Sequence, residues 1–148
     1  MSKTSRLSPG LTGVAGEYFV GAELSRHGYV ASITLRNTRG IDILASNTGA
    51  TKSVGIQVKT KSGRILNAKI EREVATNLFF VFVRLNGLDA PEYHIVSRAD
   101  VVKYVSEDHK QWLSKPARKG EAHKDNSIRN FADMGQKYLN RWELLGLD

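Results

Sequence analysis

The chain contains no cysteine, which excludes disulfide bonds and thiolate metal centres and suits a cytoplasmic protein. Long apolar runs are also missing. The longest, Leu78–Val83, has six residues, whereas a membrane-spanning helix needs about 20, so we expect no contact with a membrane. The histidines show no metal-ligand spacing, and we interpret all four as structural or surface residues: His27, His94, His109 and His123.

Acidic side chains are outnumbered by basic ones. The 148 residues include 22 Lys and Arg but only 15 Asp and Glu, which gives a formal net charge of +7. Excess positive charge favours polyanionic partners, nucleic acid first, although a solvated basic surface would give the same composition. The length and a hydrophobic fraction of 41% suit one globular domain with its own core.

The chain divides into a short arm and one domain. We predict a flexible arm over residues 1–11 and a single domain over 12–148, with a core at 12–96 and a C-terminal helical part at 97–148. The core begins with a predicted helix from an N-cap at Thr12 to the stop at Gly28. Its buried stripe would consist of apolar residues at helical spacing: Val14, Ala15, Tyr18, Phe19 and Ala22.

Apolar runs separated by turn residues predict five strands, at 29–36, 41–46, 53–61, 78–85 and 92–96. Two tight connections make the first three an antiparallel meander, and the fifth strand would pair with the fourth. Between the third and fourth strands, we predict a short extended stretch and then a helical turn.

The C-terminal part carries two predicted helical regions. The first follows a cap at Ser97, has a predicted break near Ser106, and would bury one side: Val102, Val105, His109 and Trp112. The second starts at Asp125 or Asn126 and ends at Gly146. Its apolar face would consist of Ile128, Phe131, Tyr138, Trp142 and Leu145. Both tryptophans are interpreted as core anchors because they occur at helical spacing.

Polar side chains interrupt two of the predicted strands. Asp42 lies in one, and Gln57 and Lys59 lie in the next. Because side chains alternate along a strand, pairing of these strands would bring all three to one face. Such groups are costly to desolvate unless they pair or hold a cation. The pattern indicates a functional site, and a buried Asp42–Lys59 ion pair is the alternative.

Glu17 is a further candidate on the first predicted helix. Gly13 and Gly21 lie four residues to either side of it, so this ridge could approach the sheet and direct Glu17 toward the strands. A first-turn glutamate that favours the helix dipole is the alternative.

The order of these elements resembles the PD-(D/E)XK nuclease superfamily, in particular archaeal Holliday junction resolvases and Mrr-type restriction nucleases. Glu17 precedes Gly28-Tyr29 by eleven residues, and Gly40-Ile41-Asp42 and Gln57-Val58-Lys59 match the later motifs. The resemblance covers about residues 12 to 61. Gln57 replaces the usual carboxylate, as is familiar in Mrr-like members. The resemblance implies an α/β fold with a restriction-endonuclease-like mixed sheet of about five strands flanked by helices.

The resemblance also implies a function: metal-dependent hydrolysis of DNA in restriction, repair or recombination. Mg²⁺ or Mn²⁺ would be held by Asp42, the Gln57 side-chain oxygen, the Val58 backbone carbonyl and Glu17, and Lys59 would orient or deprotonate water or stabilise the transition state. The expected nucleic-acid contacts are Arg36, Asn37, Arg39, Thr60, Lys61 and Arg64.

Other functions stay open at this point. A catalytically silent nucleic-acid-binding module would keep the fold and the basic groove. An interaction subunit would bury Trp142 and Leu145 against a partner. A homodimer would suit cleavage of two strands, and the choice between DNA and RNA is open.

Overall fold

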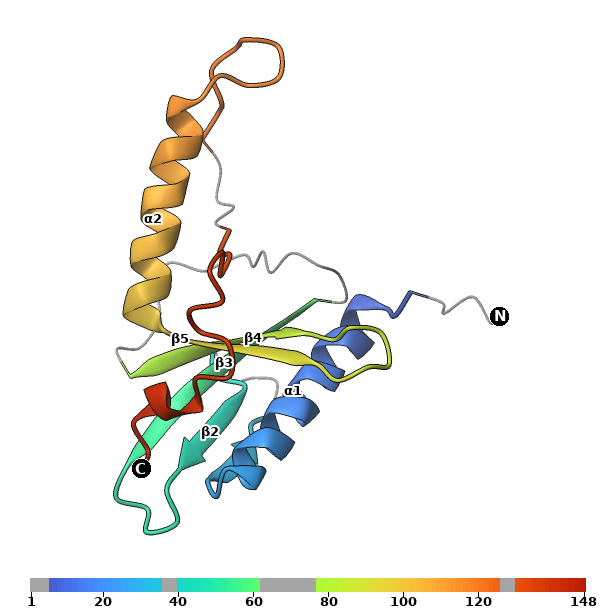
Figure 1. Cartoon of the computed structure of the whole chain (residues 1–148), viewed down its shortest axis with the longest axis vertical. Coiled ribbons are helices and arrows are strands. Elements are labelled where there is room, and N and C mark those ends of the chain that lie inside the picture. The colour runs from blue at the N-terminus through green and yellow to red at the C-terminus, as the bar shows by residue number, and fades with distance from the viewer. Residues whose placement is uncertain (1–5, 36–39, 62–76, 126–129) are drawn as a thin grey trace.

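A computed structural model describes residues 6–35, 40–61, 77–125 and 130–148. The chain forms an α/β domain around one five-stranded mixed sheet (Figure 1). The strands are β1 (Val30–Ile33), β2 (Ile43–Ser46), β3 (Ser53–Lys61), β4 (Leu78–Arg84) and β5 (Glu92–Ser97). The helices are α1 (Pro9–Arg26), α2 (Arg98–Ser114) and the 3₁₀ helix η1 (Trp142–Leu145).

The strands lie in the sheet in chain order, β1-β2-β3-β4-β5. All neighbours are antiparallel except β3 and β4, which are parallel. The predicted meander and the pairing of the last two strands are therefore confirmed. The segment that joins β3 to β4 includes residues 62–76, which the structure does not describe. The extended stretch and helical turn predicted there lie outside the described residues.

The sheet is covered on both faces at β4 and β5, whereas Leu44 of β2 is 50% exposed. On one face, here called the α1 face, Val20 and Leu24 of α1 share a core with Ile56, Val81 and Ile95. On the other, the α2 face, α2 packs against alternate residues of the same strands: Phe80 and Phe82 cluster with Val101, Val105 and Phe131. Each strand residue can therefore be assigned to one face by its register.

The first helix begins earlier than predicted. Ser8, rather than Thr12, is the N-cap, and its Oγ accepts the Leu11 N–H at 3.2 Å. Pro9 follows at the first helical position, where its missing N–H costs nothing. Residues 9–11 thus belong to α1 and not to the predicted arm.

The predicted buried stripe of this helix was wrong. The buried ridge is Thr12, Gly16, Val20 and Leu24, whereas Tyr18 is 67% exposed and Phe19 44%. The reason is close approach at Gly16: a Cβ built there would lie 1.8 Å from Thr60 Oγ1 of β3. The helix turns Gly16 and its aliphatic residues Val20 and Leu24, rather than its aromatic ones, toward the sheet.

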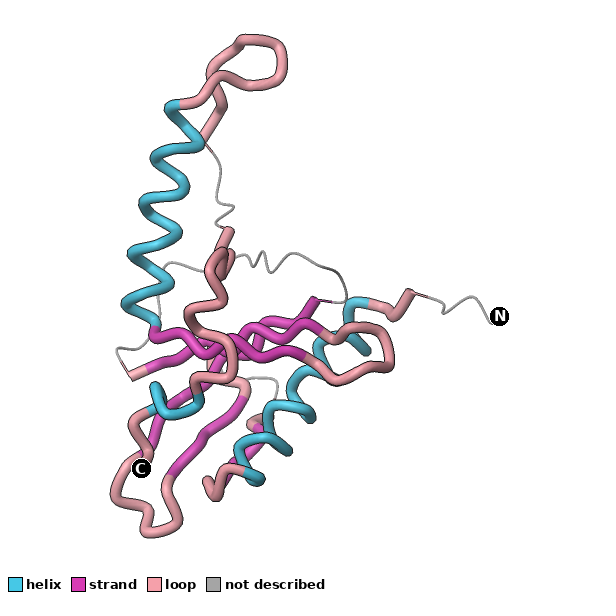
Figure 2. The backbone as a smooth tube through the Cα atoms, in the orientation of Figure 1, coloured by secondary structure: helices cyan, strands magenta, loops and turns pink. Residues whose placement is uncertain are grey.

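Helix α2 is continuous through Ser106, so the expected interruption is absent. Ser97 caps it as predicted, accepting the Asp100 N–H at 3.2 Å. Only Val101 and Val105 are buried, and Val102 is exposed. The far half projects from the sheet and ends in a loop (Figure 2).

Trp112 packs against that loop instead of the core. Its ring lies between those of His109 and His123, at centroid distances of 5.5 and 4.1 Å. Trp142, in contrast, is 3% exposed and belongs to the core of the α1 face, as predicted.

The last predicted helix was also wrong over most of its described length. Residues 130–141 form turns, and only η1 is helical. The Asp133 carboxylate accepts the N–H groups of Lys137 and Tyr138, both at 2.9 Å, which replaces helical hydrogen bonding. Gly146 ends η1 in a left-handed conformation, as expected.

Within the described ranges, no helix is both long enough and apolar enough to cross a membrane.

Candidate active site

Asp42 lies immediately before β2 and is held by the strands on both sides. Its N–H donates to the Ile56 carbonyl of β3 at 2.8 Å, and its own carbonyl accepts the Thr34 N–H at 2.9 Å. The Thr34 hydroxyl donates to the Ile41 carbonyl at 2.6 Å. The backbone that carries the carboxylate is therefore fixed within the meander.

The carboxylate of Asp42 continues the ladder where β2 ends. The Val58 N–H of β3 donates to Asp42 Oδ2 at 2.7 Å. Paired residues of β2 and β3 end at Ile43 and Ile56, so Val58 lies beyond the last β2 partner. A side chain thus binds the amide that a strand would otherwise have bound, which puts negative charge at the edge of β3 that is open among the described residues.

The Val58 carbonyl points to the same open edge. Alternate residues of β3 direct their backbone groups toward β4, as the hydrogen bonds from Gly55 N–H to Asn77 and from Leu85 N–H to Lys61 show. The backbone groups of Val58 point away from β4, since its N–H binds Asp42. Because both polar groups of one strand residue point the same way, its carbonyl lies on the Asp42 side.

Gln57 and Lys59 extend from the α2 face of β3. They pair in register with Phe80 and Phe82 of β4, whose rings belong to the core under α2. Both polar side chains are half-buried. Among the described residues no ion pair joins Lys59 to Asp42, which counts against the buried Asp42–Lys59 pair considered from the sequence.

Glu17 approaches the sheet from the other side. It is half-buried on α1, next to Gly16, and α1 covers the face to which Val58 and Thr60 belong. The structure therefore joins Asp42 to Val58 and gives Gln57 and Lys59 a common face. It does not bring Glu17 onto that face.

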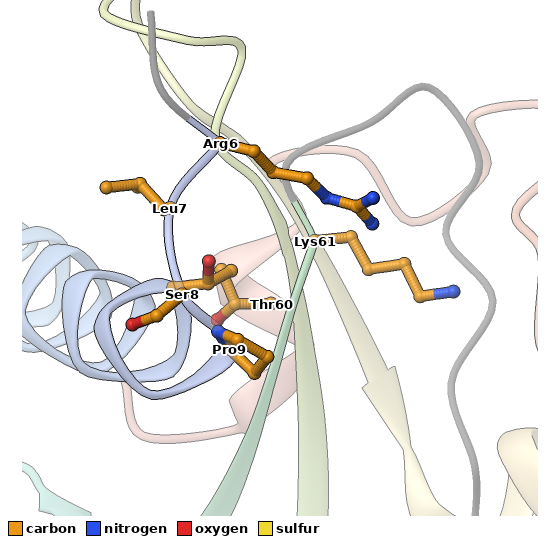
Figure 3. Close-up of a pocket in the computed structure, with 7 residues that line it drawn as sticks. Arg6, Leu7, Ser8, Pro9, Thr60 and Lys61 are labelled. Atoms are coloured by element: carbon orange, nitrogen blue, oxygen red, sulfur yellow. The ribbon is translucent and has the colours of Figure 1, made fainter.

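The expected nucleic-acid contacts are only partly described. Thr60 and Lys61 end β3 and line a cavity beside the start of α1 (Figure 3). The other four predicted contacts lie outside the described residues: Arg36, Asn37, Arg39 and Arg64.

The oxygen donors at this edge suit a hard cation. Asp42 offers a carboxylate and Val58 a carbonyl, both on the open side of β3, and Gln57 adds an amide oxygen from the adjacent position. Within the described part of the chain, no group of three or more His, Asp or Glu side chains could hold a metal ion. These donors fit a weakly bound Mg²⁺ that keeps several waters and shares a substrate phosphate.

Two positioning residues were missed from the sequence. Thr34 follows β1 and Asp42 precedes β2, and the pairing of these two strands brings them together. Gly16 was passed over in favour of Gly13 and Gly21, and the predicted close approach of that glycine ridge was wrong, because the ridge that meets β3 carries Gly16. No family model, curated protein or solved structure matches the chain.

Proposed function

We propose that this protein is a metal-dependent nuclease that hydrolyses DNA phosphodiester bonds on the PD-(D/E)XK plan. The observation that carries the proposal is the Asp42 carboxylate at the unpaired edge of β3, beside the Val58 carbonyl and without an ion pair to Lys59 among the described residues. A carboxylate held rigidly at an open strand edge is available to a cation and to a substrate.

The topology supports the same proposal. A helix, an antiparallel three-stranded meander and a fourth strand parallel to the third follow one another along the described residues, which is compatible with the αβββαβ core that the resemblance implies. In this arrangement the two motif-bearing segments, at Asp42 and at Gln57 to Lys59, become neighbours at one edge.

The residues divide the chemistry between them. Asp42 and the Val58 carbonyl would hold Mg²⁺ or Mn²⁺, and Gln57 would contribute a neutral ligand. The bound cation would lower the pKa of a water and neutralise charge on the phosphate. Lys59, on the strand that supplies Val58, would orient the attacking water or stabilise charge on the phosphate oxygens. Glu17 would contribute from the α1 side through an outer contact.

A cleavage panel tests the proposal. Labelled linear duplex, supercoiled circle, four-way junction and single-stranded DNA would be incubated with Mg²⁺, Mn²⁺ or EDTA. We expect cleavage that requires the metal and falls by about 100-fold or more in Lys59→Ala. Lys103→Ala, an exposed lysine on α2, is the matched control and should cleave normally. Cleavage that persists in EDTA, or that Lys59→Ala leaves unchanged, would contradict the proposal.

A silent nucleic-acid-binding module is the second candidate. It is favoured by the hydrogen bond between Asp42 and Val58, which alone would justify the carboxylate as a structural group. DNA binding that ignores divalent metal and Asp42, with no cleavage, would establish it. An interaction subunit has less support than either of these functions, because Trp142 and Leu145 are each only 3% exposed within the chain's own core.

A further inference from the structure

A cavity of about 840 Å³ opens where β3 ends, between that strand and the segment that leads into α1. Two cationic side chains line it: Arg6 comes from the segment before α1, and Lys61 is the last residue of β3. In Figure 3 they extend side by side from these two elements. Lys61 comes 55 positions after Arg6 in the sequence, and the cavity lies between them.

The described residues that line the cavity bring no negative charge to it, since none of them is acidic. Within the described residues, neither Arg6 nor Lys61 takes part in an ion pair, and both are exposed. Two like charges that share a cavity repel each other, and an anion between them would relieve that repulsion.

The positive charge of this cavity comes from the side chains of Arg6 and Lys61 rather than from the N-terminus of α1. Ser8 already caps α1 through its bond to the Leu11 N–H, and Pro9 has no N–H to offer. The first turn of α1 has no acidic residue, so the helix dipole adds to the positive potential without providing a separate site.

The cavity lies close to the proposed reaction centre along the same strand. Lys61 follows Lys59 by two residues, and both side chains belong to the same face of β3. At about 3.3 Å per residue, the two positions are about 7 Å apart. A nucleic-acid strand advances about 3.4 Å along the duplex axis per phosphate. A phosphate adjacent to the one being cleaved would therefore lie within reach of a lysine two residues further along β3.

We propose that Arg6 and Lys61 bind a backbone phosphate of the substrate strand, adjacent to the scissile phosphate. This inference rests on the proposed nuclease function, because it uses Lys59 as the reference point. Arg6 can bind two phosphate oxygens at once, and Lys61 adds a point charge. Contacts of this kind position the strand and carry no base preference.

The test compares Arg6→Gln/Lys61→Gln with a control that removes the same charge elsewhere, Arg118→Gln/Lys119→Gln in the loop beyond α2. Affinity for labelled single-stranded and duplex DNA would be measured in EDTA over a range of salt concentrations. For the first variant we expect binding about three- to tenfold weaker. We also expect a salt slope smaller by about 0.7 to 0.9 for the lost phosphate. The control should keep the wild-type slope. Equal effects in both variants, or none in the first, would overturn the inference.

Neutral methylphosphonate linkages separate this inference from the proposed function. In wild type, one neutral linkage next to the cleavage position should weaken binding, and in Arg6→Gln/Lys61→Gln the same linkage should cost nothing further. If wild type cleaves DNA but the neutral linkage weakens binding equally in wild type and in the variant, the phosphate site is wrong and the nuclease proposal stands. If wild type cleaves no DNA but the first variant still loses affinity and salt slope, the nuclease proposal fails and the phosphate site survives as part of a binding module.

Discussion

The backbone and the carboxylate of Asp42 are both held by hydrogen bonds to neighbouring segments. One carboxylate oxygen accepts the Val58 N–H, which lacks a partner on β2. The backbone of Asp42 is hydrogen-bonded to Ile56 on one side and to Thr34 on the other. Such a carboxylate is preorganised, because little conformational freedom remains to be lost when a cation binds.

In the proposed metal site, the neutral side chain of Gln57 would limit the negative charge offered to a cation, which leads to a prediction. Gln57→Glu adds a carboxylate of nearly the same shape next to Asp42, and we expect it to tighten Mn²⁺ binding by about tenfold. Gln111→Glu adds the same charge on an exposed turn of α2 and should leave metal affinity unchanged. Titration calorimetry would measure both. Equal affinities in the two variants would mean that Gln57 does not face the metal.

Two buried tyrosines predict how stability changes at alkaline pH. The hydrogen bond from the Tyr29 hydroxyl to Asp148, 2.7 Å long, and burial raise the pKa of Tyr29 from 10.0 to about 12. Burial raises the pKa of Tyr93 to about 12 as well. Between pH 10 and 12 the unfolded chain would release these protons while the folded chain keeps them. Below pH 10 the contribution of these two groups to the free energy of unfolding should not change with pH. The free energy of unfolding should then fall as pH rises from 10 to 12.

Denaturant unfolding across that window, with Tyr29→Phe beside wild type, measures the effect. The variant lacks one of the two titrating groups, so its stability should decline less steeply with pH. A phenolate absorbance titration would follow ionisation directly. If both proteins decline equally and all tyrosines ionise near pH 10, the explanation is wrong.

At the scale of elements, the contact between α1 and β3 depends on one glycine. At Gly16 an added Cβ would lie 1.8 Å from Thr60 Oγ1 and 2.8 Å from Thr60 Cβ. Gly16→Ala should therefore destabilise the fold by about 1–3 kcal/mol through overpacking. Gly13, on the same helix, has nothing within 4 Å of an added Cβ. Gly13→Ala should stabilise the fold by about 0.5–1 kcal/mol.

Thermal unfolding of the two alanine variants would decide this point. Thr60→Ala removes two of the three closest atoms and should partly restore the stability of Gly16→Ala. Equal effects of Gly13→Ala and Gly16→Ala would show that α1 does not approach β3 closely at this point.

The same helix shows why its buried side could not be predicted from apolar spacing. Apolar residues occur all around α1, so hydrophobicity does not distinguish the Tyr18 side from the Val20 side. Close packing decides the matter, since the ridge that reaches β3 must carry a glycine opposite Thr60. Thr60 lies 44 positions after Gly16, so the sequence of the helix itself carries no signal of this requirement.

The last predicted helix failed for a different physical reason. Asp133 is 3% exposed at its side chain and lies 2.8 Å from His94 Nδ1 of β5. This tertiary contact holds the carboxylate where it binds the N–H groups of Lys137 and Tyr138. The turn follows from a pairing between distant residues, which outweighs the helical spacing of the apolar residues.

At the scale of the whole molecule, the sheet was the predictable part. Each strand is a short apolar run bounded by turn residues, and β3 (Ser53–Lys61) matches its predicted range. Alternation along these strands predicted the faces of the candidate site, and it correctly placed Gln57 and Lys59 on one face of the sheet and Val58 on the other. The hydrogen bond between Asp42 and Val58 could not be predicted, because it depends on where β2 stops pairing.

The central claim is that the charge of Asp42, and not only its hydrogen bond, serves the reaction. Asp42→Asn tests it most directly, because the amide oxygen can still accept the Val58 N–H. Single-turnover cleavage of the preferred DNA would be measured with Mg²⁺, alongside thermal stability and DNA affinity. We predict that cleavage falls at least about 100-fold while stability and DNA affinity stay near wild type. Wild-type cleavage by Asp42→Asn would contradict the claim and leave Asp42 as a structural partner of Val58.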